Sequence, residues 1–246
     1  MKDGFRFLPA LIALFVLAMP ALAIDIDTVE EVAGTPVSLD IGGANLACGA
    51  DVYNNTGATY FSTGSLPRWH LLDDGAFPAG TAPVTVECID FSLNQTAAGQ
   101  LYVRVNFYDT LVPAGPICNL AFLGGVTVNF GVVPVGAFSS GLLTLPVKIA
   151  FPDDSWCVEF SYLSAVSPDV ASTSATVLFA NGGPTVGSNN GGVYYRDANG
   201  NGSFECPGEA RAFAAPNLSQ FYLRLQRQLP TSTDPTTWGS VKGLYR

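Results

Sequence analysis

The segment QLYVRVNFYD, residues 100–109, alternates apolar and polar side chains with a period of two. Successive side chains of a β-strand point to opposite faces, so this pattern is typical of a strand with one buried face. The polar set, which includes Arg104 and Asn106, would face outward. The apolar set would face a core and consists of Leu101, Val103, Val105 and Phe107.

Similar runs recur along the chain between glycine, proline and asparagine residues. Their short connections favour antiparallel pairing, and sheets with one apolar face cover it by packing together. We therefore predict an all-β fold, an antiparallel, jelly-roll-like β-sandwich formed by residues 24–227 as a single domain. Two domains are the alternative, but no linker interrupts residues 36–227. The clearest runs are 83–93, 100–110, 125–133, 142–151, 155–163, 174–180 and 218–226, and the weaker ones are 36–41, 58–62 and 193–196.

The N-terminus, MKDGFRFLPALIALFVLAMPALA, has the pattern of a secretory signal peptide. Basic residues precede an apolar run that is short for a membrane span, and Ala21-Leu22-Ala23 supplies small residues for cleavage before Ile24. An uncleaved membrane anchor is the alternative. No later apolar run approaches about 20 residues, so no transmembrane segment is expected in the mature chain. We predict a signal peptide at residues 1–23 and a secreted or cell-surface protein.

The net charge excludes one class of partner. The full chain has 11 basic and 20 acidic residues, and removal of residues 1–23 leaves 9 and 19, a formal charge of −10. A surface of this sign repels phosphate backbones, so nucleic-acid binding is not expected. It attracts cations, including calcium outside the cell.

Five cysteines remain in the mature chain: Cys48, Cys88, Cys118, Cys157 and Cys206. In an exported protein, they are expected to form disulfides rather than bind metal. Two bridges and one remaining thiol can be drawn in about 15 ways, and the sequence does not choose between them. Cys88 and Cys157 lie in strand-like runs, whereas Cys118 and Cys206 are expected in loops. The odd cysteine is either a buried thiol or a link to a partner chain.

The segment DANGNGSFECPGE, residues 197–209, has the spacing of a calcium loop, with Gly202 at the sharp turn. It resembles the EF-hand-like loops of exported proteins such as dockerin modules, over about a dozen residues. The resemblance implies structural Ca²⁺ as the one candidate cofactor. It departs from the pattern at its end, where Gly208 takes the place of the closing carboxylate and Glu209 follows one position late. The candidate ligands are Asp197, Asn199, Asn201, Ser203 and Glu205.

The same segment also has the sequence of a plain turn. Asn-Gly occurs twice in succession, at 199–200 and 201–202, and this dipeptide favours tight turns without any metal. A strand-like run rather than a helix precedes the loop. The sequence therefore leaves a calcium loop and a hairpin tip as alternatives.

Catalytic chemistry is limited because His70 is the only histidine. A Ser-His-Asp triad would have to use it as the base, and the chain contains no G-x-S-x-G segment and no glycine-rich phosphate loop. We expect His70 to be a surface or packing residue.

Paired carboxylates remain possible, because a glycosidase needs only two. Glu87 and Glu159 lie within predicted strands, where they would either occupy the solvent face or project into a cleft. The pairs Asp73-Asp74 and Asp153-Asp154 are expected in turns, where they would be solvated.

Aromatic residues near loops leave carbohydrate binding open, because aromatic faces beside polar amides can hold pyranose rings. They equally could fill the ends of a sandwich. The similarity to jelly-roll carbohydrate-binding modules, which often carry structural calcium, is a likeness of fold and says little about the ligand. The aromatic residues are Tyr53, Tyr60, Trp69, Tyr194 and Tyr195.

Residues 228–246 form a Pro/Thr linker and a short tail, in which Asp234 and Pro235 could start a short helix. The last nine residues, WGSVKGLYR, resemble C-terminal tails that recur on secreted bacterial proteins. This resemblance implies a bacterial source and a sorting or attachment role for the tail, and the chain as a whole resembles bacterial secreted β-sandwich proteins.

These observations favour a non-catalytic exported β-sandwich that acts in surface structure, adhesion or extracellular assembly, with possible calcium stabilisation. A polysaccharide or another surface protein would be its partner. The alternatives are a carbohydrate-binding module and a carboxylate-based glycosidase or lyase. The ligand and the oligomeric state are not determined by the sequence.

Overall fold

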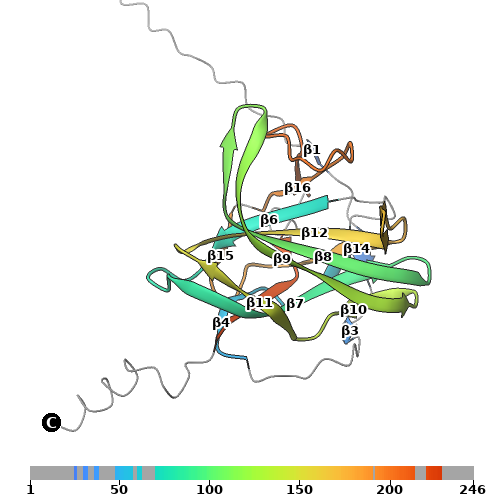
Figure 1. Ribbon diagram of the computed structural model, residues 1–246, viewed down its shortest axis with the longest axis horizontal. Helices are drawn as coiled ribbons and strands as arrows, with labels where there is room; N and C mark the ends of the chain where they lie inside the picture. Colours follow the sequence, from blue (N-terminus) through green and yellow to red (C-terminus); the bar gives the residue numbers. More distant parts are fainter. Residues whose placement is uncertain are drawn as a thin grey trace, which may run out of the picture.

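A computed structural model describes residues 25–26, 30–32, 36–38, 48–57, 60–62, 70–190, 192–213 and 220–228. Within these ranges the chain forms β-strands and no helix. The strands make two sheets that pack face to face, and Figure 1 shows them as two layers, with β6, β12 and β8 above β7 and β11. The predicted all-β sandwich is confirmed.

The first sheet, sheet I, contains nine of the described strands and is antiparallel except where β1 pairs with β17. Its order along the main path is β1-β17-β16-β6-β12-β8-β9, and β13 and β15 pair with β12 and β6. The strands are β1 (Asp25–Ile26), β6 (His70–Ala76), β8 (Gly99–Ala114), β9 (Ile117–Val133), β12 (Ser155–Val166), β13 (Asp169–Ala171), β15 (Ser188–Asn189), β16 (Tyr194–Arg196) and β17 (Ala210–Ala212).

The second sheet, sheet II, contains ten of the described strands and is antiparallel except where β10 pairs with β3. Its central strand, β7, pairs with β10, β11, β14 and β19 along different parts of its length. The strands are β2 (Glu30–Val32), β3 (Val37–Ser38), β4 (Asp51–Asn54), β5 (Tyr60–Ser62), β7 (Val84–Gln95), β10 (Gly136–Ser139), β11 (Leu143–Phe151), β14 (Ala175–Ala180), β18 (Gln220–Phe221) and β19 (Leu223–Arg227).

The core lies between the two sheets, and β8 shows how the sequence builds it. The apolar side chains of β8 that were predicted to face inward, such as Val103 and Phe107, are fully buried, while the alternate side chains are partly exposed. Aromatic rings join the sheets across the core, because Phe160 on sheet I lies 4.9 Å from Phe91 and 5.7 Å from Phe221 on sheet II, measured between ring centroids. Burial of these side chains supplies the main driving force for the fold.

Two disulfides connect segments far apart in the sequence. Cys48 pairs with Cys88 on β7, and Cys118 pairs with Cys206. Cys118 lies in β9 rather than in the expected loop, because the strand begins one residue earlier. Cys157 on β12 is a buried thiol rather than a link to a partner, and burial raises its pKa. Two disulfides are typical of proteins that fold in an oxidising compartment outside the cytoplasm.

The predicted signal peptide and the tail lie outside the described residues, apart from residue 228. In the described part of the chain, no helix is long and apolar enough to cross a membrane.

Candidate functional site

The end of β8 and the start of β9 form a hairpin, residues 109–122, that rises from sheet I beside β16 and is called the arm here (Figure 1). Shifts of register around Tyr108 separate the arm from the rest of the strand pair, and such irregularities bend a sheet. The arm packs over the outer face of sheet I, the face turned away from the core. A second cluster of buried residues, separate from the core between the sheets, forms where the arm meets sheet I and the 197–209 loop. It consists of Leu72, Leu111, Cys118, Cys157, Phe204 and Cys206.

The arm is fixed to the loop that follows β16. The backbone N–H of Cys118 donates to the carbonyl of Phe204 at 3.0 Å, and that of Cys206 donates to the carbonyl of Pro116 at 3.1 Å. The Cys118–Cys206 disulfide joins the two residues that donate these hydrogen bonds. The arm and the loop are therefore held together covalently and by backbone pairing.

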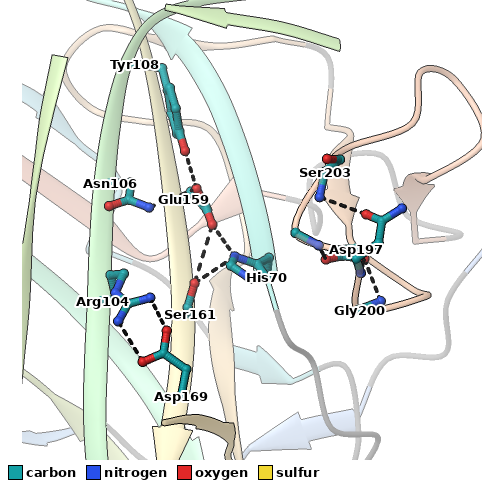
Figure 2. A network of polar contacts seen from close by, with 12 residues as sticks. His70, Arg104, Asn106, Tyr108, Glu159, Ser161, Asp169, Asp197, Gly200 and Ser203 are labelled. Carbon is teal, nitrogen blue, oxygen red and sulfur yellow. Dashed lines mark hydrogen bonds and ion pairs between the residues drawn. The ribbon is translucent and has the colours of Figure 1, made fainter. Parts of the chain in front are cut away.

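A polar network around Glu159 occupies the outer face of sheet I (Figure 2). The Glu159 carboxylate contacts Nδ1 of His70 through one oxygen. Its other oxygen accepts hydrogen bonds from the Tyr108 hydroxyl at 2.5 Å and from Nδ2 of Asn106 at 3.2 Å. Neighbouring strands β6, β12 and β8 bring these residues together, because Glu159 is directly opposite Leu72 on one side and Asn106 on the other.

The surroundings of Glu159 favour its charged form. Burial alone would raise the pKa of this carboxyl group. The pKa is nevertheless held below its usual value, first by the hydrogen bond and the charge of His70 and then by the hydrogen bonds from Tyr108 and Asn106. Glu159 is only 4% exposed, so the expectation of a solvent-facing strand residue is wrong. The side chain is buried because its lone pairs are satisfied by neighbouring strands.

Ser161 and His70 do not have the geometry of a catalytic triad. The Ser161 hydroxyl lies 2.8 Å from Nδ1 of His70, the same ring nitrogen that contacts Glu159. In a triad, the nucleophile and the acidic residue contact different ring nitrogens, so that a proton can move between them. The His70 side chain is 13% exposed, and its ring takes part in the polar network on the outer face of sheet I.

An ion pair extends the same polar row along sheet I. Arg104 donates from both terminal nitrogens to Asp169, at 2.6 and 3.0 Å. Hydrogen bonds from Arg104 are the main cause that lowers the pKa of Asp169. The pair is partly exposed, so we expect it to contribute little to stability.

Asp73 and Asp74 are not turn residues, contrary to the prediction. Both lie inside β6, and both are buried. Asp73 points into the core, where its carboxylate accepts hydrogen bonds from Nδ2 of Asn189 at 2.9 Å and the backbone N–H of Phe221 at 3.0 Å. Buried polar groups need such partners, and these ones come from distant parts of the sequence. The exposed Asp153 and the half-buried Asp154 do lie between β11 and β12, as predicted.

Asp74 points to the opposite side of β6 and lines a cavity of about 420 Å³ between sheet I and the arm. One of its oxygens accepts a hydrogen bond from Nδ2 of Asn190 at 2.8 Å. Burial raises the pKa of Asp74 to about 6, although the Asn190 hydrogen bond acts in the other direction. The polar lining residues are Asp74, Asn190 and Tyr195, and the apolar ones are Leu111, Pro113, Val193, Pro207 and Ala210.

The two glutamates considered as a catalytic pair lie on different sheets. Glu87 is on β7 of sheet II, in an ion pair with Lys148 at 3.3 Å, whereas Glu159 is on β12 of sheet I. The core separates the two sheets, so these side chains do not flank one glycosidic bond. Among the described residues that line the cavity, Asp74 is the one carboxylate.

The 197–209 loop connects the antiparallel strands β16 and β17. Asp197 is 3% exposed, and its carboxylate accepts hydrogen bonds from the backbone N–H groups of Gly200, Asn201 and Gly202 at 2.7 to 3.2 Å. Gly200 and Gly202 have positive φ angles of 71° and 77°, which glycine adopts without strain. Figure 2 shows Asp197 at the centre of this turn.

Glu209 closes the loop, although the calcium pattern does not include it. Its carboxylate accepts hydrogen bonds from the backbone N–H groups of Ala198 at 2.7 Å and Glu205 at 3.1 Å. The late acidic residue noted in the sequence thus binds the backbone across the loop, and its burial at 4% exposure follows from those bonds.

Three of the predicted calcium ligands converge. Nδ2 of Asn199 contacts both Glu205 oxygens, at 3.0 and 3.2 Å, and Nδ2 of Asn201 contacts one of them at 2.9 Å. The Oδ1 atoms of Asn199 and Asn201 accept hydrogen bonds from the backbone N–H groups of Asn201 and Ser203. A half-turn of both amides would direct two carbonyl oxygens and the Glu205 carboxylate, which are ligands that Ca²⁺ prefers, to a common point, but it would break these two hydrogen bonds. This donor set would therefore hold Ca²⁺ only weakly. The described residues contain no cluster of three or more His, Cys, Asp or Glu side chains suited to a metal.

The aromatic residues are divided between the core and the cavity. Tyr53 and Tyr194 are fully buried and cannot stack on a ligand. Tyr195, the next residue on β16, is half-buried and lines the cavity. Trp69 and the side chain of Tyr60 lie outside the described residues.

The cavity was not foreseen from the sequence, because its lining comes from β6, the arm, residues 190–195 and the end of the loop. No motif links Asp74 with Asn190. The one available signal was the alternation in LLDDG, which places Asp73 and Asp74 on opposite faces of a strand. Comparisons with known protein families, with curated proteins and with solved structures find no match for this chain.

Proposed function

We propose that this chain is a non-catalytic exported β-sandwich that acts by binding, in adhesion, surface structure or extracellular assembly. The observation that carries the proposal is that Asp74 is the one carboxylate among the described residues that line the cavity. Asp74 lines the cavity, whereas Glu159 is held by His70, Tyr108 and Asn106 outside the cavity lining. Carboxylate-based hydrolysis needs two such groups on either side of one bond.

The disulfides support the exported part of the proposal. A bridge spanning 88 residues fixes the arm, and a second spanning 40 residues fixes the segment before β4 to β7. Such bridges persist where no cytoplasmic reductant is present. A rigid, covalently braced surface suits a protein that must keep its shape outside the cell.

The test has two arms. Residues 24–246 are incubated with a broad set of polysaccharides, and released reducing ends are measured for the wild type, Asp74→Asn and Glu159→Gln. We expect the same background from all three, and recovery of the wild-type protein with cell-surface or extracellular material after fractionation. Turnover that either variant abolishes would support the glycosidase or lyase instead, and recovery in the cytoplasm would contradict export.

We also propose that Ca²⁺ stabilises the 197–209 loop as a structural ion. The support is the convergence of Asn199, Asn201 and Glu205 described above. Asp197 and Glu209 already order the backbone through N–H groups, so the ion would add to a formed loop. With one carboxylate among the three converging side chains, we expect a dissociation constant of roughly 10⁻⁴ to 10⁻³ M.

The calcium proposal is checked by thermal unfolding in EGTA and in about 5 mM calcium, with magnesium as the control ion. At ten times its dissociation constant, a ligand stabilises the folded state by about 1.4 kcal/mol, which raises the midpoint by about 3–6 °C in a chain of this size. Glu205→Gln should abolish the shift and leave the midpoint in EGTA nearly unchanged. Asp197→Ala should also lower the midpoint in EGTA, because three backbone N–H groups lose their acceptor. Equal midpoints in EGTA and calcium would make the loop a plain turn.

A further inference from the structure

We propose that the cavity between β6, β16 and the arm binds a neutral saccharide unit. This inference rests on the proposed binding function and names the chemical class of its ligand. The cavity volume of about 420 Å³ falls in the usual range of small-molecule sites, about 300–1,000 Å³.

The polar groups of the cavity suit hydroxyl groups. One Asp74 oxygen accepts from Asn190, and the other has no hydrogen-bond partner among the described residues, although Asp74 is only 9% exposed. The half-buried Tyr195 is close enough to Asp74 for that charge to raise the pKa of its phenol, after the larger effect of burial. A carboxylate and a phenol on one wall, with an amide beside them, can accept from and donate to adjacent hydroxyls.

The remaining walls suit the C–H faces of a sugar ring. Tyr195 contributes an aromatic ring to the lining, which also includes Leu111 and Pro113 from the arm and Pro207 from the loop. Sites for small ligands combine apolar and aromatic walls with a few polar groups that fix orientation. A sugar has this same mixture of hydroxyl edges and apolar faces.

The charges around the cavity disfavour anionic ligands. Asp74 lies in the lining, and Glu159 lies on the adjacent strand. None of the described lining residues is basic. Phosphate, sulfate and uronate groups would therefore meet negative potential without a compensating cation.

The walls are held in place before a ligand arrives. Pro113 pairs with Cys118 in the arm, and Pro207 follows Cys206, so the Cys118–Cys206 disulfide joins the two sides. Ordering the walls in advance lowers the entropy lost on binding. The same bridge places the calcium loop next to the cavity.

The experiment is binding of residues 24–246 to an array of neutral, uronate-bearing, sulfated and amine-bearing oligosaccharides, followed by titration calorimetry with the neutral probe retained best. We expect retention on neutral probes. Asp74→Asn should weaken binding at least tenfold, because an amide cannot replace the charged acceptor, and Tyr195→Ala should weaken it at least tenfold through loss of the aromatic face. The matched control, Tyr102→Ala, changes a half-buried tyrosine of β8 outside the described lining and should bind like the wild type.

Thermal midpoints of all variants separate loss of binding from loss of folding. If Asp74→Asn does not fold, the saccharide affinities of Tyr195→Phe and Tyr195→Ala are compared. The inference requires that Tyr195→Phe, which keeps an aromatic ring, binds more tightly than Tyr195→Ala. Retention on no neutral probe would overturn it, as would equal binding by the Asp74, Tyr195 and Tyr102 variants. Preference for amine-bearing probes would assign the cavity to cations. A failure of saccharide binding in these experiments would contradict the ligand proposed here but not the proposed non-catalytic surface function. Hydrolysis of a probe would contradict the non-catalytic function itself.

Discussion

The carboxyl group of Asp73 is fully buried in the core between the two sheets. Burial raises its pKa to about 8, and the neighbouring Asp74 acts in the same direction, against the hydrogen bonds from Phe221 and Asn189. The folded chain therefore holds a proton that the unfolded chain has released above about pH 4. The stability linked to this proton is fully present below pH 4 and is lost as the pH rises through 8.

We expect the free energy of unfolding to fall between pH 6 and pH 8 by up to about 1.4 kcal/mol per pH unit, measured by denaturant titration at several pH values. Asp73→Asn should remove this slope, because an amide does not ionise. Asp74 contributes mainly below pH 6, where its own pKa lies. Asp153→Asn, a change at an exposed site, should keep the wild-type slope. Parallel pH curves for the wild type and Asp73→Asn would contradict this account.

Gly75 allows two segments to approach β6 closely. A Cβ atom at this position would lie 2.2 Å from the carbonyl oxygen of Ser188 and 2.6 Å from the Trp156 ring. Both neighbours are packed, one as backbone and one as a fully buried side chain.

Gly75→Ala should destabilise the protein by about 1–3 kcal/mol, the usual cost of overpacking, as measured by thermal or denaturant unfolding. Gly183→Ala is the matched control, because a Cβ atom there would meet nothing within 4 Å. A Gly75→Ala protein as stable as the control would show that β15 and Trp156 can move apart without cost.

At the residue scale, the sequence indicates which side chains of a strand share a face but not which polar ones are buried. The alternation in β8 was visible because every inward position is apolar. In β6 the inward position is Asp73, and its partners Asn189 and Phe221 are 116 and 148 residues away. A strand with two acidic residues has low β-propensity, so a turn was the reasonable prediction.

The arm is the element on which the proposed site depends. Outside its own β-hairpin it is held by two backbone hydrogen bonds, by the Cys118–Cys206 bridge and by the packing of Leu111 in the buried cluster on the outer face of sheet I. Its surface includes Val112, Ile117 and Phe122, which are 46%, 50% and 62% exposed. Burial of apolar side chains therefore contributes little to the free energy that keeps the arm packed on sheet I.

Replacement of Cys118 and Cys206 by alanine should release the arm. We expect faster amide hydrogen exchange in residues 109–122 and 197–209, and a loss of stability of about 2–4 kcal/mol. Replacement of Cys48 and Cys88 is the control, because it should lower the stability without changing exchange in the arm. Unchanged exchange in the arm after loss of its bridge would mean that the hairpin and its packing are sufficient.

Long strands could be predicted as elements, whereas their partners and their bends could not. The runs at 83–93, 100–110 and 155–163 correspond to β7, β8 and β12. The arm depends on shifts of register near Tyr108, which leave no period-two signature. The pairing of Cys118 with Cys206 was one of many possibilities until the strands were placed.

At the scale of the whole molecule, strands from the early and late parts of the chain meet in sheet II beside β7. The early strand β4 and the late strand β19 pair with each other, and β19 also pairs with β7. The sandwich was predictable because one-sided strands must bury their apolar faces. Its strand order was not, because most pairings join residues far apart in the sequence, where local patterns carry no information.

This arrangement predicts where the chain can be shortened. Phe221, Leu223 and Leu225 are fully buried, and β19 lies between β4 and β7 in sheet II. Removal of residues 220–246 would expose these faces and take away one of the partners of β7 and the partner of β4, so we expect no cooperative unfolding transition by circular dichroism. Removal of residues 229–246 keeps both strands and should leave one transition near the wild-type midpoint. A cooperative transition in the shorter chain would show that the sandwich folds without its last strand, and a lost transition in the longer one would give residues 229–246 a part in folding.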